Sequence, residues 1–173
     1  MHEFTELADR CATFTLKSLR EANERTIDAL QTSGATTLVK TLQMIQLQKA
    51  ILAVGMLSIF EAILQDRLNC ADGFKEAKSV LAGAGESSLL EKFDDALLAI
   101  NVLKHGRGRS YDRLVAKAPN LPFKVLLPGD SFFEEGDVSE ISTLIEVDDN
   151  FVELCGTLIG EVTQSLQIHR PGF

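Results

Sequence analysis

The chain has 173 residues, of which 45% are hydrophobic and 24% are charged, and its formal net charge is −8. This length and balance predict one globular domain over residues 1–173, large enough to bury a core without disulfides or metals. The negative charge excludes non-specific coating of nucleic acid, which requires a basic surface, but it permits a local basic patch.

No segment predicts a membrane span or a secretion signal. The longest uncharged helical run, Ala50 to Phe60, lies between Lys49 and Glu61, and it falls short of the roughly 20 apolar residues that a span needs. The N-terminus lacks the basic and apolar regions of a signal peptide. We therefore expect a cytoplasmic protein with no membrane partner.

Hydrophobic periodicity predicts a first helix from residue 3 to about residue 32, ended by Ser33-Gly34. Its expected core stripe, at helical spacing, begins with Phe4, Leu7, Cys11 and Phe14.

A second helix, from about Ala35 to Leu68, should form the centre of the fold. Apolar residues surround it almost completely, and such a helix is packed by neighbours on all sides. Gly55 costs about 1 kcal/mol against alanine, which indicates close helix packing at that point. A narrow polar stripe should face solvent or a polar cleft, and it comprises Ser58, Glu61 and Gln65.

A short third helix is expected at Gly73 to Leu81, before a break at residues 83–85. The fourth helix should open with a capping box, in which Ser88 and Glu91 satisfy free N–H groups, and end at Gly106. Its predicted core face comprises Leu89, Phe93, Ala96, Ile100 and Leu103. The adjoining stripe carries Asp94, Leu98, Asn101 and His105, so the last two are neighbours one turn apart.

A fifth helix is expected at Ser110 to Lys117, before the break at Pro119 to Pro122. The last helix should begin near Asp149, with Asn150 as its N-cap and Glu153 three residues later, and run to about Gln167. Between them, Phe123 to Leu127 and Glu140 to Val147 predict a small hairpin or extended arm, joined by the loop Pro128 to Gly136. The fold class is therefore a mainly α, single-domain bundle of about five to six helices with a β-rich or extended insertion near residues 123–147.

The cysteines and the acidic residues predict no metal site and no cofactor. Three widely spaced cysteines without a Cys-x-x-Cys pair indicate buried free thiols in a reducing compartment: Cys11, Cys70 and Cys155. An acidic cluster lacks the spacing of an EF-hand and indicates a solvated loop: Asp130, Glu134, Glu135 and Asp137. Hydrolase and metalloprotease motifs are absent from the sequence.

The densest basic cluster follows the fourth helix. It comprises Lys104, Arg107, Arg109, Arg113 and Lys117 with His105, opposed by Asp112 alone. Arginines on a glycine turn can bind phosphate by bidentate contacts, although a solvated turn is the commoner outcome. His105 could serve as an acid or base and Asn101 could orient it. Alternatively, the helix dipole alone favours a histidine there.

Glu61 and Arg67 are a weaker, supporting pair, because a glutamate on an apolar helix often serves as a buried structural partner of an arginine.

The helix from Leu57 to Arg67, followed by a helix ending in Asn101-x-x-x-His105-Gly106, resembles the HEPN family over about residues 35–115. The resemblance implies a small helical bundle, usually a homodimer. It also implies either a metal-independent endoribonuclease of toxin–antitoxin or phage-defence systems, or a protein that only binds RNA or nucleotides. Asn101 and His105 match the family motif R-N-x-x-x-H, but Ile100 occupies the arginine position.

The resemblance implies that His105 is the acid or base for attack by the RNA 2′-OH, with Asn101 orienting it or the phosphate. Arg107, Arg109 or Arg67 would have to replace the missing arginine. Because that arginine is lost, a binding or degenerate form is favoured, and catalysis stays open. The alternative is a non-catalytic module for protein–protein interaction or self-assembly.

Overall fold

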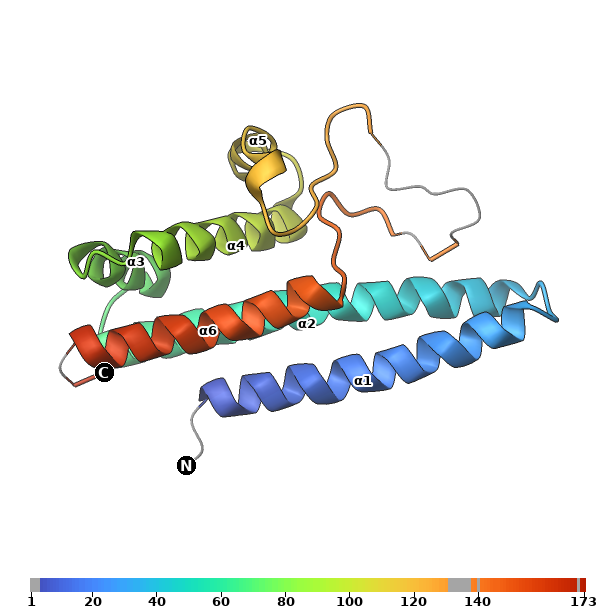
Figure 1. The fold of residues 1–173 in the computed structure, drawn as a ribbon, viewed down its shortest axis with the longest axis horizontal. Helices are drawn as coiled ribbons and strands as arrows, with labels where there is room; N and C mark the ends of the chain where they lie inside the picture. The colour runs from blue at the N-terminus through green and yellow to red at the C-terminus, as the bar shows by residue number, and fades with distance from the viewer. Residues whose placement is uncertain (1–3, 131–137, 140, 171) are drawn as a thin grey trace.

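The computed structural model describes residues 4–130, 138–139, 141–170 and 172–173. The α-helices in these ranges are α1 (Phe4–Leu30), α2 (Thr36–Leu68), α3 (Gly73–Gly83), α4 (Ser87–His105), α5 (Arg109–Val115) and α6 (Asp149–His169), and a 3-10 turn lies at Ala118–Asn120. Figure 1 shows α1, α2 and α6 as a group of long helices, with α3, α4 and α5 on one side of it. The predicted mainly α bundle is confirmed.

The centre of the fold is α2, which contacts α1, α3, α4 and α6. Leu57, Phe60 and Leu64 are almost completely buried, and each such side chain stabilises the fold by about 1.5–3 kcal/mol. The Phe60 ring stacks on Phe4 of α1 and meets the edge of Phe93 of α4. Aromatic contacts on one side of α2 therefore join three helices.

An ion-pair network around Asp149, at the start of α6, adds polar contacts between the long helices. Its carboxylate lies 3.0 Å from Arg20 of α1 and 2.8 Å from Lys49 of α2. Burial raises the pKa of this carboxyl, but the hydrogen bonds and charges of Lys49 and Arg20 outweigh burial and hold the pKa below its ordinary value. One carboxylate thus links the three long helices.

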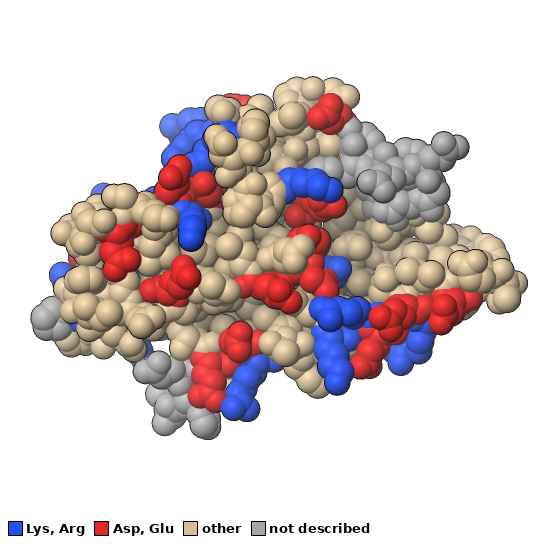
Figure 2. Space-filling model, in the orientation of Figure 1, with Lys and Arg blue, Asp and Glu red and all other residues tan. Residues whose placement is uncertain are grey.

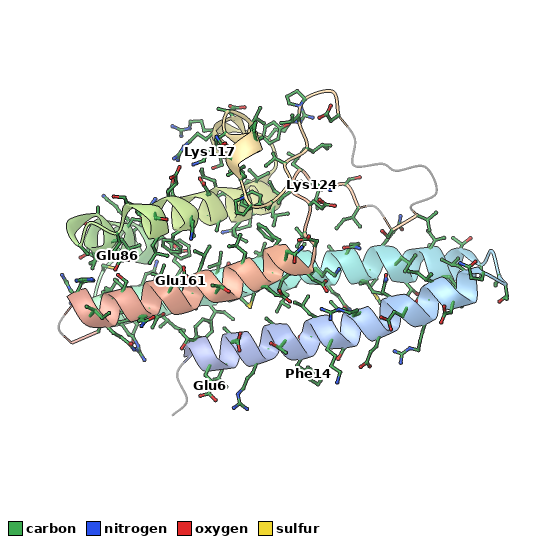
Figure 3. The ribbon with its side chains drawn as sticks, in the orientation of Figure 1. Glu6, Phe14, Glu86, Lys117, Lys124 and Glu161 are labelled. Atoms are coloured by element: carbon green, nitrogen blue, oxygen red, sulfur yellow. The ribbon has the colours of Figure 1, made fainter. Side chains whose placement is uncertain are left out.

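The expected core face of α1 is wrong. The buried face carries Ala8, Ala12 and Leu16, whereas Leu7 is half exposed and Phe14 is 74% exposed. Phe14 projects from the outer side of α1 (Figure 3). Both stripes have helical spacing, and the small alanines allow the close approach to neighbouring helices that Phe14 would prevent.

The expectation that α2 is surrounded is also wrong. Every neighbouring helix packs on the side that carries Leu57 and Phe60, so Ile51 and Ile59 on the other side are exposed. Gly55, expected at a close helix contact, has open space where a Cβ would stand. By length and composition α2 could cross a membrane, with 33% of its most apolar window buried. One such helix is weak evidence, because core helices of soluble proteins share these properties.

Two predicted helix caps are wrong. Helix α4 begins one residue before Ser88, after Glu86, which provides no side-chain cap. Asp148, rather than Asn150, caps α6, and its carboxylate accepts a hydrogen bond of 2.8 Å from the Phe151 N–H. Asp148 has the extended backbone that a cap requires, whereas Asn150 already lies within the helix.

The insertion is an extended arm. Within its described residues, β pairing is limited to one antiparallel bridge between Val125 and Ile145. The Phe123 ring packs edge-on against Phe151 and so holds the arm on α6. Most of the predicted loop Pro128 to Gly136, and most of the acidic cluster, lie outside the described ranges, which omit residues 131–137. The residues that the structure describes hold no cluster of three or more metal-ligating side chains.

The expectation of buried thiols holds only for Cys155, where burial raises the pKa to about 12. Cys11 is exposed, because it lies on the outward face of α1, and Cys70 is half-buried.

Gly73 allows α3 to begin directly against α2. A Cβ there would lie 2.7 Å from both the Glu61 carbonyl oxygen and the Leu64 Cβ. We predict that Gly73→Ala lowers the free energy of unfolding by about 1–3 kcal/mol through overpacking. Urea denaturation followed by circular dichroism measures this change.

The matched control is Gly83→Ala in the same helix, where a Cβ meets open space. It should leave stability unchanged or raise it by up to about 1 kcal/mol. Equal effects of the two substitutions would contradict the close approach at Gly73.

Candidate nucleic-acid interface

The basic residues predicted as a site lie at the junction of α4 and α5. Gly106 ends α4 with a φ of 72°, a left-handed conformation that favours glycine, and its N–H donates to the Val102 carbonyl at 2.8 Å. The four residues that flank this turn are exposed: Lys104, His105, Arg107 and Arg109. We call them the basic edge.

The rest of the predicted basic cluster is neutralised by acidic residues of α4. Arg113 contacts the Asp94 carboxylate at 2.7 Å, and Lys117 forms an ion pair with buried Asp95. The hydrogen bond to Asp95 raises the pKa of Lys117. These pairs hold the α5 region against α4, so neither cation is free for a ligand.

The lysine and arginines of the basic edge are not neutralised by any acidic residue that the structure describes. Within the described part of the chain, Lys104, Arg107 and Arg109 form no ion pair. The Arg107 guanidinium instead stands over the Tyr111 ring, 5.5 Å from the ring centroid.

Tyr111 is itself fixed, because its hydroxyl donates a hydrogen bond of 2.6 Å to the Leu126 carbonyl. Figure 2 shows Lys and Arg side chains gathered beside α5, whereas Asp and Glu side chains predominate over α6. A local positive surface therefore exists on an acidic protein.

A polar cleft of about 400 Å³ lies beside the basic edge. Asn101 and Lys104 line it from α4, and Ser58 and Glu61 line it from α2, so two of the three residues of the predicted polar stripe of α2 face a cleft. Its other charged lining residues are Asp72, Lys75, Lys78, Asp94 and Arg113. Because cations and acids are mixed there, uncompensated positive charge lies mainly on the basic edge.

Asn101 and His105 do not share the cleft. Asn101 lines it, whereas His105, one turn further along α4, is exposed and is not among the lining residues. Within the described ranges His105 has no hydrogen-bond partner that would orient its ring. A general base needs such positioning, so this arrangement fits ligand contact better than proton transfer.

The arginine position of the family motif holds Ile100, a buried apolar residue that lines the cleft beside Asn101 and brings no charge to it. Of the proposed replacements, Arg67 stands over the Phe173 ring at 5.4 Å and does not line the cleft. It also forms no ion pair with Glu61 among the described residues. Arg107 and Arg109 lie outside the cleft lining.

Sequence reasoning missed the role of Asp94, which joins three helices at the cleft by ion pairs. Its carboxylate contacts Lys78 of α3 at 2.9 Å and Arg113 of α5 at 2.7 Å. Asp94 shares a helical stripe with Asn101, which was the available signal. Burial raises the pKa of this carboxyl, but the hydrogen bonds and charges of Lys78 and Arg113 outweigh burial and hold it below its ordinary value of 3.8.

We predict that Asp94→Asn lowers the free energy of unfolding at neutral pH by about 1 kcal/mol, because two partly exposed ion pairs are lost. A carboxyl whose pKa is depressed by folding stabilises the fold above its unfolded pKa, and this contribution is lost as the pH falls through the folded-state pKa. The difference between wild type and variant should therefore vanish in acid.

Urea denaturation across a pH series measures this difference. Glu24→Gln, an exposed acid of α1, is the matched control for the loss of one negative charge. A deficit for Asp94→Asn that persists unchanged in acid would contradict the ion-pair account.

Comparison of the chain with protein-family models, curated proteins and solved structures finds no match.

Proposed function

We propose that this protein binds RNA through the phosphates of a single strand and does not cleave it. The observation that carries the proposal is the basic edge, where Lys104, Arg107 and Arg109 are exposed and without acidic partners in the described part of the chain. Guanidinium groups suit phosphate, because they offer bidentate hydrogen bonds. The proposal also agrees with the cytoplasmic location expected from the sequence.

The adjoining cleft supports contact with a nucleotide rather than with phosphate alone. Asn101 and Ser110 present uncharged hydrogen-bonding groups within it. A base edge or ribose hydroxyl of a bound strand could use such groups while its phosphates contact the basic edge. Tyr111 is buried and supports Arg107 rather than offering a stacking surface.

Two features favour binding over catalysis. His105 lacks an orienting partner in the described ranges, and the motif arginine is replaced by the buried Ile100. A metal-independent nuclease needs both a positioned base and a cation at the developing phosphate charge.

The test is fluorescence anisotropy with a labelled mixed-sequence single-stranded RNA in EDTA. We predict that the double variant Arg107→Ala/Arg109→Ala binds at least about tenfold more weakly than wild type. Its slope of log affinity against log salt should be shallower by about 1.4, which corresponds to two phosphate contacts on a single strand. The double variant Lys17→Ala/Arg25→Ala, which removes two exposed cations of α1, should bind as wild type does.

The same RNA run on a denaturing gel measures cleavage. We expect intact RNA with wild type and with His105→Ala. Cleavage by wild type that His105→Ala abolishes would replace the binding proposal with a nuclease. Absence of both binding and cleavage, with folded protein, would contradict any function on RNA.

A second candidate function, a module for self-assembly, is favoured by a separate observation: the exposed apolar side of α2.

A further inference from the structure

We propose that α2 pairs with α2 of a second copy of this chain, antiparallel and about a two-fold axis. The contact surface is the α2 stripe, which we define as Lys40, Met44, Leu47, Gln48, Ile51, Gly55, Ile59, Ala62 and Asp66. The proposal does not depend on RNA binding.

The α2 stripe is open and is apolar apart from Gln48 and its charged ends, Lys40 and Asp66. Its four large apolar side chains are about half exposed: Met44 (48%), Leu47 (50%), Ile51 (61%) and Ile59 (55%). The α2 residues buried by α1, α3, α4 and α6 lie on the opposite side of the helix. Scattered apolar residues on a surface are ordinary, but a continuous apolar stripe indicates a contact surface.

The order of large and small residues along the α2 stripe selects an antiparallel partner. The large side chains Met44 and Ile51 lie in its first half, and the small residues Gly55 and Ala62 lie in its second half. A two-fold axis at the level of Ala53 places Met44 opposite Ala62 of the second copy, and Ile51 opposite its Gly55. Met44 and Ile51 thus each meet a small residue, as interdigitation requires, whereas Leu47 faces Ile59 of the second copy as an apolar pair.

The charged ends fit the same register. Lys40 and Asp66 are equally far from Ala53 in the sequence, so each faces the opposite charge of the second copy. Both are exposed, and within the described part of the chain neither forms an ion pair. Parallel pairing would instead set Lys40 against Lys40 and large residues against large ones. The opposite charges of Lys40 and Asp66, together with the size matches of Met44 and Ile51, therefore favour a second copy in this antiparallel register.

Gly55 is the point of closest approach. A Cβ there would meet no atom within 4 Å in the single chain, so glycine is not required by the monomer's packing. A glycine within a helix costs about 1 kcal/mol against alanine. In the proposed pair it provides the space for Ile51 of the second copy.

The area is sufficient for a weak but specific dimer. From Lys40 to Asp66 the α2 stripe is about 40 Å long. A helix contact of that length buries on the order of 1,000 Å² in total, near the lower limit for specific interfaces. We therefore expect dissociation in the micromolar range.

Sedimentation of the full chain over a concentration series tests the proposal. Wild type should be a dimer at about 100 μM and dissociate on dilution. Gly55→Leu should weaken the dimer at least about tenfold while leaving thermal stability at low concentration equal or higher, because leucine is the better helix former. Phe14→Asp, the control, replaces a more exposed apolar side chain outside the α2 stripe and should not change dissociation.

The register is tested by charge exchange. Lys40→Asp and Asp66→Lys should each weaken the dimer, because each places like charges together, and the double variant should restore it. A monomeric wild type at about 100 μM, whether or not it binds phosphatidylglycerol vesicles, would overturn the proposal. A dimer insensitive to Gly55→Leu, or one that the double variant does not restore, would also overturn it.

Discussion

The packing of four helices on one side of α2 is the constraint on which the rest of the structure depends. Leu57, Phe60 and Leu64 form the centre of that packing, and α1, α3, α4 and α6 all contact α2. Because the neighbours share one side, the other side stays open although it is also apolar. The fold and the proposed pairing are therefore two consequences of one helix that is apolar nearly all round.

Two carboxylates complement this core by fixing helix junctions. Asp149 joins α1, α2 and α6, and Asp94 joins α3, α4 and α5. Asp94 and Asp95 also neutralise Arg113 and Lys117, so the unpaired cations of that basic cluster lie at the end of α4 and in the turn that follows it. An acidic chain can thereby present a small basic surface, and the proposed RNA contact depends on that separation of paired from unpaired cations.

Periodicity predicted the helices well, because helical spacing is a local property of the sequence. It could not choose the buried side of α1, since the stripes through Ala12 and through Phe14 have the same spacing. It could not decide whether Gly55 faces a neighbour within the chain, because that depends on where the other helices pack. In the candidate site, the stripe from Asp94 to His105 was predictable, but the ion pair of Arg113 was not. Its partner lies nineteen residues away, and only tertiary packing brings the two together.

The central claim, that the open side of α2 pairs antiparallel with a second copy, is tested most directly by an inter-chain distance. A spin label at Thr37→Cys, with Cys11 and Cys70 replaced by serine, can be measured by double electron–electron resonance. The antiparallel register predicts a separation of about 50 Å, since the two labels lie at opposite ends of the paired helices. A separation under about 25 Å would indicate parallel helices, and the absence of any dipolar signal would indicate a monomer. Either result would contradict the account.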